Sequence, residues 1–240
     1  RRLGEGEAAE HHRVGCRKKA ERTPCPLRDA RLVLNLSKDR FVEFSWDVKL
    51  WLQRGPPAVD AARPARCPMC GVASRDARHG LQVHGHGLRR RVQWGPMAPW
   101  REASREAVQL RRYVCLRCCS VLVVGPRGLA PRKRYSGAAI GLALALWALT
   151  GMPEPKVFER VGVYPLSPTV EVQGWRSLRR WTADAVSGAL WPGLCMHVQG
   201  STYRQHAGRI AATLAGFAPD PEVGSKAARA FFGAKHARRG

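Results

Sequence analysis

The sequence lacks a long apolar run, and this absence excludes several classes of protein. Its longest apolar stretch, Ala138 to Leu149, has 12 residues, well short of the ~20 that cross a bilayer as a helix. The first 30 residues contain no apolar segment of the kind found in secretory signal peptides. We therefore expect a cytoplasmic protein with no membrane partner, in which reduced cysteines bind metal rather than form disulfides.

Acidic residues are also scarce. The 240 residues include 18 Asp and Glu against 41 Lys and Arg, so the formal net charge is +23. A GC-rich genome would raise the Arg content through codon usage, but it would spread Arg evenly along the chain. Residues 66–135 hold 15 basic and 3 acidic residues, which is +12 of the +23. This local excess indicates a polyanionic partner, most simply nucleic acid.

Carboxylates are too few in the C-terminal part to build a nuclease site. After Glu171 the chain has only Asp184, Asp220 and Glu222. They fall on too short a segment for a fold that holds Mg²⁺ on three separated carboxylates, so two-metal chemistry has no candidate catalytic residues. We expect a protein that is not an enzyme, with a metal-dependent nuclease as the disfavoured alternative.

The sequence does contain two pairs of cysteines with the spacing of metal ligands. Cys67 and Cys70 form one C-x-x-C pair, and Cys115 and Cys118 form the other. Four thiolates hold structural zinc in a full tetrahedral site, which stabilises a fold and activates no water. The alternative, a thiol–disulfide exchange site, needs a helix N-terminus in a βαβ setting, whereas strand and turn residues flank both pairs. We predict a zinc ribbon over residues 67–130.

The turns that follow the two pairs differ. Gly71 follows the first pair, where a positive φ angle is commonly needed, whereas Cys119 takes this place after the second pair and is a candidate substitute ligand. The 44 residues between the pairs exceed the ~15 to 20 of a compact site. Strands predicted over 81–94 and 107–114 would close the gap by pairing antiparallel, and a further short strand is expected over 121–124.

The N-terminal part divides into a tail and a β segment. Residues 1–30 are polar and aperiodic, and we expect them to be disordered. Residues 31–66 are expected to form a β-hairpin and a linker, because 32–36 and 42–46 alternate in hydrophobicity on either side of a turn. Residues 47–53 either prolong the second strand or begin a short helix.

Residues 135–190 are expected to form three helices arranged as a helix-turn-helix. The first, over 136–149, is capped by its serine and apolar on nearly every side, so it should be buried. A short second helix is expected over 153–161. The third begins between Thr169 and Trp175 and carries an apolar stripe at three- and four-residue steps.

The third helix also carries a basic face. Arg176, Arg179 and Arg180 lie off the apolar stripe and would face solvent or the major groove of DNA. A helical bundle whose arginines are merely solvated is the alternative. Two more amphipathic helices are expected within 200–240. The predicted fold class is α+β: a small β zinc ribbon with an N-terminal β-hairpin, followed by an all-α helix-turn-helix segment and C-terminal helices.

Basic runs and two histidines are the candidate nucleic-acid contacts. His84 and His86 share one face of a predicted strand, where they could bind metal, contact phosphate or base, or be ordinary surface residues. Cationic runs beside a metal turn and before a helical segment are suited to phosphate contacts, with solvated charge as the alternative. The full candidate set is His84, His86, Arg89, Arg90, Arg91, Arg111, Arg112, Arg132, Lys133, Arg134, Arg176, Arg179 and Arg180.

Several of these motifs occur together in a known family. They are Cys67-Pro-Met-Cys70-Gly, Leu81-Gln-Val-His84-Gly-His86-Gly, Arg112-Tyr113-Val-Cys115-Leu-Arg-Cys118, Pro126-Arg-Gly, Arg134-Tyr135-Ser136 and Gly174-Trp-Arg-Ser-Leu-Arg-Arg-Trp181. As a set, over residues 66–185, they resemble the bacterial zinc-ribbon/helix-turn-helix proteins of insertion-sequence type, which are similar to the N-terminal region of transposases. The resemblance implies DNA binding in a mobile-element context, and it does not carry over catalysis.

The sequence thus predicts a DNA-binding protein stabilised by structural Zn²⁺. Duplex DNA is the expected partner, and the expected role is that of an accessory factor, a regulator or a remnant of a transposition system. The alternative is an RNA-binding or assembly protein in which the basic ribbon clamps structured RNA.

Overall fold

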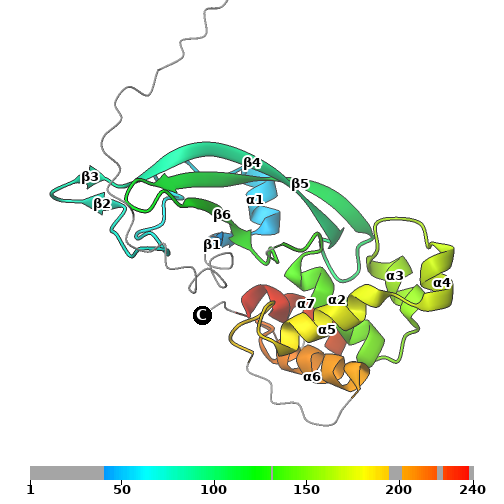
Figure 1. Cartoon of the computed structure of the whole chain (residues 1–240). Coiled ribbons are helices and arrows are strands. Elements are labelled where there is room, and N and C mark those ends of the chain that lie inside the picture. The colour runs from blue at the N-terminus through cyan, green and yellow to red at the C-terminus, as the bar shows by residue number, and fades with distance from the viewer. Residues whose placement is uncertain (1–40, 131, 195–201, 221–223, 238–240) are drawn as a thin grey trace, which may run out of the picture. The chain divides into compact units, whose positions relative to one another are not determined.

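The computed structural model describes residues 41–130, 132–194, 202–220 and 224–237 (Figure 1). The tail predicted over 1–30 and the first strand of the predicted hairpin lie outside these residues. Within them the fold is mixed α+β, as predicted, with one four-stranded sheet, one two-stranded sheet and seven helices. No helix in the described ranges is both long and apolar enough to cross a membrane.

The larger sheet has the strand order β1-β6-β5-β4. β4 (Val83–Pro96) and β5 (Ala103–Cys115) pair antiparallel from one end to the other, which confirms the pairing predicted between the cysteine pairs. Both strands extend closer to their connecting loop than the sequence predicted. β6 (Val121–Arg127) follows the second cysteine pair and pairs antiparallel with β5. Because β5 runs antiparallel to β4, the second cysteine pair at the end of β5 lies at the end of the sheet where β4 begins.

The edge strand β1 (Phe41–Asp47) pairs with β6 in parallel. The sequence predicted that β1 belongs to a local hairpin, so this distant partner was not foreseen. Helix α1 (Val48–Arg54) follows at once, because the side chain of Asp47 accepts a hydrogen bond of 2.8 Å from the backbone N–H of Leu50 and caps the helix. Of the two alternatives for this segment, the helix is confirmed.

The segment predicted as a linker after α1 packs against the sheet. Tyr113 of β5 donates its hydroxyl to the carbonyl of Val59 at 2.7 Å, and Ala62 is buried beside the cysteines. Between this segment and β4 lies a two-stranded sheet of β2 (Arg75–Asp76) and β3 (Gly80–Leu81). The predicted linker thus packs on the larger sheet rather than extending through solvent.

The helical part is built around α2 (Gly137–Ala148), which is buried on nearly every side as predicted. Ser136 caps α2 by accepting from the N–H of Ala139 at 3.0 Å. The short helix α3 (Glu154–Val161) also lies where it was expected. The predicted third helix is two helices, α4 (Pro168–Gln173) and α5 (Arg176–Val186). A turn at Gly174, which has a φ of 75°, separates them.

Helices α6 (Tyr203–Gly216) and α7 (Lys226–His236) share one hydrophobic core with α2, α3 and α5 (Figure 1). The sequence placed these two helices in a separate C-terminal segment. The apolar surface of α2 explains the difference, because a helix with no polar face must be covered on all sides. The buried side chains of Ile210, Leu214 and Phe231 supply part of that cover.

Candidate metal centre and nucleic-acid interface

The four predicted cysteine ligands come together at the end of the sheet where β4 begins and β5 ends. All four Sγ atoms lie within 4.8 Å of one another, and Cys67–Cys118 and Cys70–Cys115 are each 3.7 Å apart. A tetrahedron with Zn–S bonds of ~2.3 Å has S···S edges of about 3.8 Å. The separations therefore fit a tetrahedral metal ion of this size, and the four cysteines could hold one.

Backbone turns hold the first cysteine pair in place. The N–H of Gly71 donates to the carbonyl of Cys67 at 2.8 Å, and the N–H of Cys67 donates to the carbonyl of Val72 at 2.8 Å. Gly71 has a φ of 71°, which is the positive angle expected from the sequence. Such a turn directs both thiols to the same side of the chain.

The second pair uses a cysteine where the first uses a glycine. Cys119 has a φ of 56°, in the left-handed region, and a non-glycine residue there costs about 1 kcal/mol. Its side chain is exposed, and it is not part of the four-cysteine group. Cys119 thus serves the turn and does not take the place of a ligand.

The pKa values of two of the thiols, Cys115 and Cys118, shift in opposite directions. Burial raises the pKa of Cys115 to about 12, although the N–H groups of Cys118 and Arg117 partly offset it. Burial also opposes ionisation of Cys118, but hydrogen bonds from the side chain and backbone of Ser120 and from its cysteine neighbours outweigh burial and lower its pKa to about 7. A bound cation would favour ionisation of the thiols.

The two predicted histidines do not join the cysteines. His84 Nε2 lies 2.8 Å from the carbonyl oxygen of Leu81, and His86 is exposed. Among the described residues, the four cysteines are the only group of three or more metal-ligating side chains. A second metal site at the His-Gly run is therefore not formed in this part of the chain.

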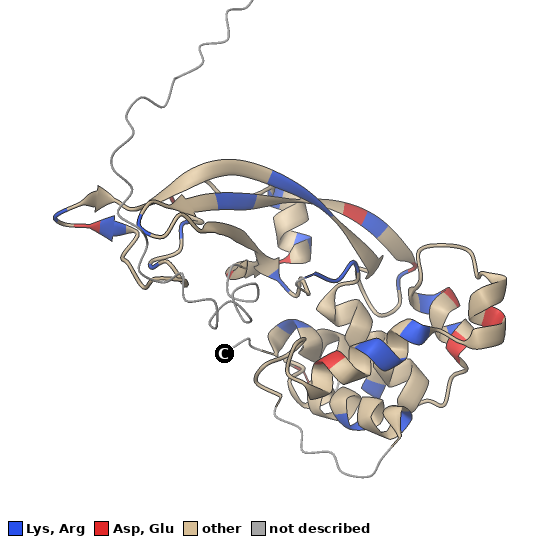
Figure 2. Cartoon of the chain, viewed as in Figure 1, with Lys and Arg blue, Asp and Glu red and all other residues tan. Residues whose placement is uncertain are grey.

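Seven of the predicted basic residues surround one open hollow of about 860 Å³. They come from the middle of β4 and β5 and from the loop between β6 and α2, and Figure 2 shows Lys and Arg on these segments. The described lining contains no carboxylate. We call this site the basic hollow; it is lined by Arg89, Arg90, Arg91, Arg112, Arg132, Lys133 and Arg134, together with Phe41, Val92, Leu110, Val121 and Val123.

Some of these cations hold the hollow in shape. The Arg91 guanidinium donates to the carbonyl of Ala130 at 2.5 Å and to the carbonyl of Lys133. Lys133 in turn forms an ion pair with Asp184 of α5. Arg134 stacks over the ring of Trp94, with the guanidinium carbon 4.7 Å from the ring centroid. These contacts join the basic loop to β4 and to α5, so the two basic runs form one surface.

The remaining predicted contacts lie elsewhere. Arg111 points to the opposite face of β5, where its Nε donates to the carbonyl of Pro57 at 2.7 Å, so it does not line the hollow and its contact with nucleic acid stays a prediction. On α5, Arg176 donates to Gln173 at 2.9 Å, and Arg179 lies 3.8 Å from a carboxylate oxygen of Glu154. The three arginines of α5 are exposed and none of them lines the basic hollow.

Sequence reasoning missed the apolar part of the hollow. Phe41, Val121 and Val123 lie on neighbouring strands and are half-buried, while Val92 is 40% exposed. Alternation along β1 and β6 was the available signal, but only the sheet order shows that these positions lie beside the arginines of β4 and β5.

Comparisons with models of known families, with curated proteins and with solved structures gave no match for this chain. The similarity of its motifs to insertion-sequence proteins therefore stays a prediction. Its function has to be inferred from the geometry and charge of the cysteine group and the basic hollow.

Proposed function

We propose that the protein is a zinc-stabilised nucleic-acid-binding protein whose basic hollow contacts the phosphate backbone. The observation that carries this proposal is the meeting of two basic runs, 89–91 and 132–134, that are far apart in the sequence. The described lining holds seven cations and no carboxylate, which favours a polyanion, although Lys133 is paired with Asp184 behind it.

Zinc is the metal that we propose for the four cysteines. Four thiolate donors at tetrahedral separations favour zinc over the hard cations Mg²⁺ and Ca²⁺, which take oxygen ligands. All four positions of such a site are filled by protein, so the metal would stabilise the fold and leave no place for a reacting water. The metal would fasten the chain before β2 to the end of β5, and thereby support the sheet that carries the hollow.

Helix α5 is the second candidate surface for nucleic-acid binding. It would be the recognition helix of a helix-turn-helix that binds duplex DNA. The observation in its favour is that Arg176, Arg179 and Arg180 are all exposed on one helix. The contacts of Arg176 and Arg179 with α4 and α3 weaken this assignment. We therefore place the main contact with nucleic acid at the hollow.

We propose that the protein has an accessory or regulatory role in a transposition system, without catalysis. Structured RNA is the alternative partner.

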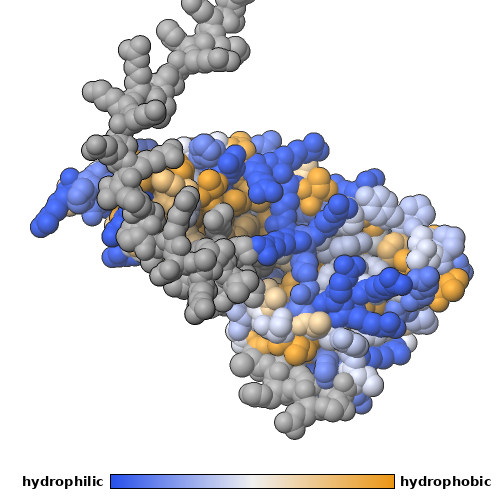
Figure 3. Space-filling model, in the orientation of Figure 1, coloured by the Kyte–Doolittle hydropathy of each residue, from blue (hydrophilic) through white to orange (hydrophobic). Residues whose placement is uncertain are grey.

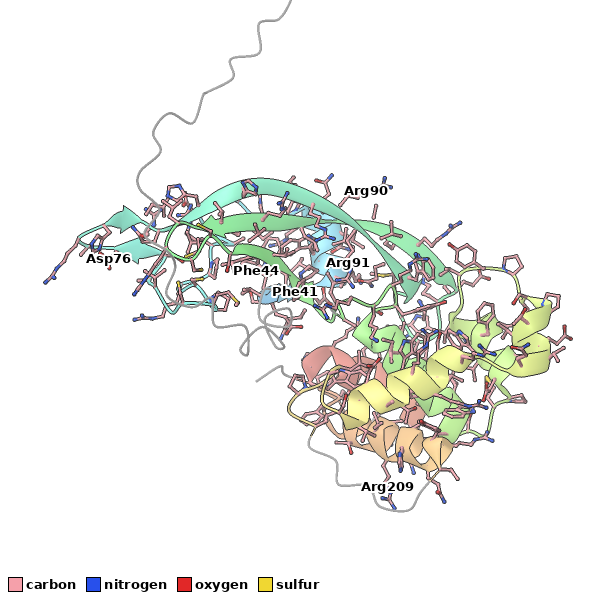
Figure 4. The ribbon with its side chains drawn as sticks, viewed as in Figure 1. Phe41, Phe44, Asp76, Arg90, Arg91 and Arg209 are labelled. Atoms are coloured by element: carbon pink, nitrogen blue, oxygen red, sulfur yellow. The ribbon has the colours of Figure 1, made fainter. Side chains whose placement is uncertain are left out.

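A binding assay on the zinc-loaded full chain tests the proposal. Arg89 and Arg112 line the hollow and have no role in holding its loop, so Arg89→Gln/Arg112→Gln should weaken oligonucleotide binding by at least about tenfold at ~100 mM salt. The matched control is Arg78→Gln/Arg209→Gln, which removes the same charge from exposed positions outside the hollow; Figure 4 labels Arg209 on α6. Equal losses in the two variants would refute the hollow as the binding surface.

A further inference from the structure

The basic hollow combines cations with an apolar floor, and this combination bears on the form of nucleic acid that it binds. Five of its twelve described lining residues are apolar. The four that lie on β1, β5 and β6 form the floor: Phe41, Leu110, Val121 and Val123. Figure 3 shows apolar residues over the sheet bordered by hydrophilic ones. In Figure 4, Phe41 and Arg91 are both labelled over the sheet, and Arg90 lies at its outer edge.

A duplex does not match this floor. Its bases are stacked inside, and its outer surface presents phosphates and sugars, so an apolar floor between cations would face charged or polar groups. An unpaired strand can turn its bases toward an apolar surface while its phosphates contact the surrounding cations. The volume of about 860 Å³ lies in the range of pockets that enclose a drug-sized ligand, which is closer in size to a nucleotide than to a double helix.

The cations are placed to contact a single backbone. Arg89 pairs with Leu110 across β4 and β5, so an exposed cation stands directly beside a floor residue. On the side of the helical part, the loop that carries Arg132 is held to β4 by Arg91. Cations thus stand on two sides of the floor, within reach of the phosphates on either side of a base.

We propose that the basic hollow binds unpaired nucleotides, with bases against the apolar floor and phosphates at the arginines. This inference rests on the proposed nucleic-acid function and specifies its substrate class as single-stranded nucleic acid. The apolar floor raises the affinity for a single strand above that for a duplex, and the cations provide the affinity common to both.

The test compares a single-stranded oligonucleotide of about 12 nucleotides with a duplex of the same length, by fluorescence anisotropy at ~100 mM salt on the zinc-loaded full chain. The wild-type protein should bind the single strand at least about tenfold more tightly than the duplex. A floor variant, Val121→Thr/Val123→Thr, keeps the side-chain shape and adds hydroxyls on the face of the sheet that carries Arg112. It should lose about tenfold in single-strand affinity and leave duplex affinity unchanged.

The matched control is Val172→Thr on α4, a residue that is 84% exposed and outside the hollow. Its affinities should equal those of the wild type, and the melting temperature and zinc content of each variant show whether it is folded. A duplex bound as tightly as the single strand, or a floor variant with unchanged affinity, would overturn this inference and leave the proposed function intact. Failure of Arg89→Gln/Arg112→Gln to weaken either ligand would overturn the proposed function itself.

Discussion

At the scale of single residues, the candidate metal site depends on four thiols whose Sγ atoms lie within 4.8 Å of one another. A C-x-x-C spacing is a local pattern, so Cys67, Cys70, Cys115 and Cys118 could be chosen as ligands without knowledge of the fold. Their convergence depends on the pairing of β4 with β5, and that pairing was predicted from two runs of strand-like sequence. The role of Cys119 could not be predicted, because only the backbone angle shows that it acts in the turn.

Removal of one ligand should therefore empty the metal site. We expect Cys67→Ser to lower the zinc content from about one ion per chain to almost none, and to lower the thermal midpoint of the β part, because zinc binding is worth on the order of 10 kcal/mol in such sites. Cys119→Ser, the control, should keep its zinc. Metal analysis by mass spectrometry and thermal unfolding measure both, and a metal-free Cys119→Ser would contradict the ligand assignment.

Lys235 gives a second prediction at this scale. Its Nζ lies 4.9 Å from the ring centroid of Phe231, and burial lowers its pKa, an effect that Asp47 opposes and Lys49 strengthens. Because the pKa is lower in the folded state, the charged lysine destabilises the fold at neutral pH. This penalty is relieved as the pH rises from the folded pKa toward ~10.5.

The variant Lys235→Met should thus raise the free energy of unfolding at pH 7, and the gain of stability at alkaline pH should disappear. Denaturant unfolding at several pH values measures the effect. Lys226→Met, at the exposed start of the same helix, should change stability by no more than about 0.5 kcal/mol. A less stable Lys235→Met at pH 7 would show that the aromatic contacts outweigh the cost of burial.

At the scale of helices and strands, the sequence predicted most elements but fewer of their partners. Alternation showed that residues 42–46 form a strand, yet a period of two carries no information about which strand lies beside it. The sequence therefore did not predict that Phe41–Asp47 pairs in parallel with β6, far along the chain. The helices over 136–149 and 153–161 were predicted correctly because caps and prolines are local signals.

Packing between helices gives a prediction at this scale. A Cβ atom on Gly233 of α7 would lie 1.6 Å from the carbonyl oxygen of Leu214, so the two helices can approach only with glycine at this position. Gly233→Ala should destabilise the protein by at least about 2 kcal/mol. Gly216→Ala, whose Cβ would meet nothing within 4 Å, should be neutral or stabilising by up to about 1 kcal/mol. Equal midpoints in urea unfolding would disprove the close contact.

At the scale of the whole described fold, basic residues that lie far apart in the sequence come together on one surface. Basic runs can be counted in a sequence, but whether they meet depends on the sheet order and on the loop held by Arg91. The same order places Phe41, Val121 and Val123 beside the cations, and therefore the apolar part of the hollow could not be predicted. Arg111 is a predicted contact that lies outside the hollow, on the face of β5 opposite Arg112, as strand alternation predicts.

The measurement that tests the central claim most directly is the salt dependence of oligonucleotide binding. For the zinc-loaded wild type, log K should fall steeply and linearly with log[salt] between ~50 and ~200 mM, because bound cations release counterions from the phosphates. Arg89→Gln/Arg112→Gln should reduce the slope by about 1.5, since two phosphate contacts are lost. Arg78→Gln/Arg209→Gln should keep the wild-type slope. A wild-type affinity that does not depend on salt, or a slope that the hollow variant leaves unchanged, would contradict nucleic-acid binding at the basic hollow.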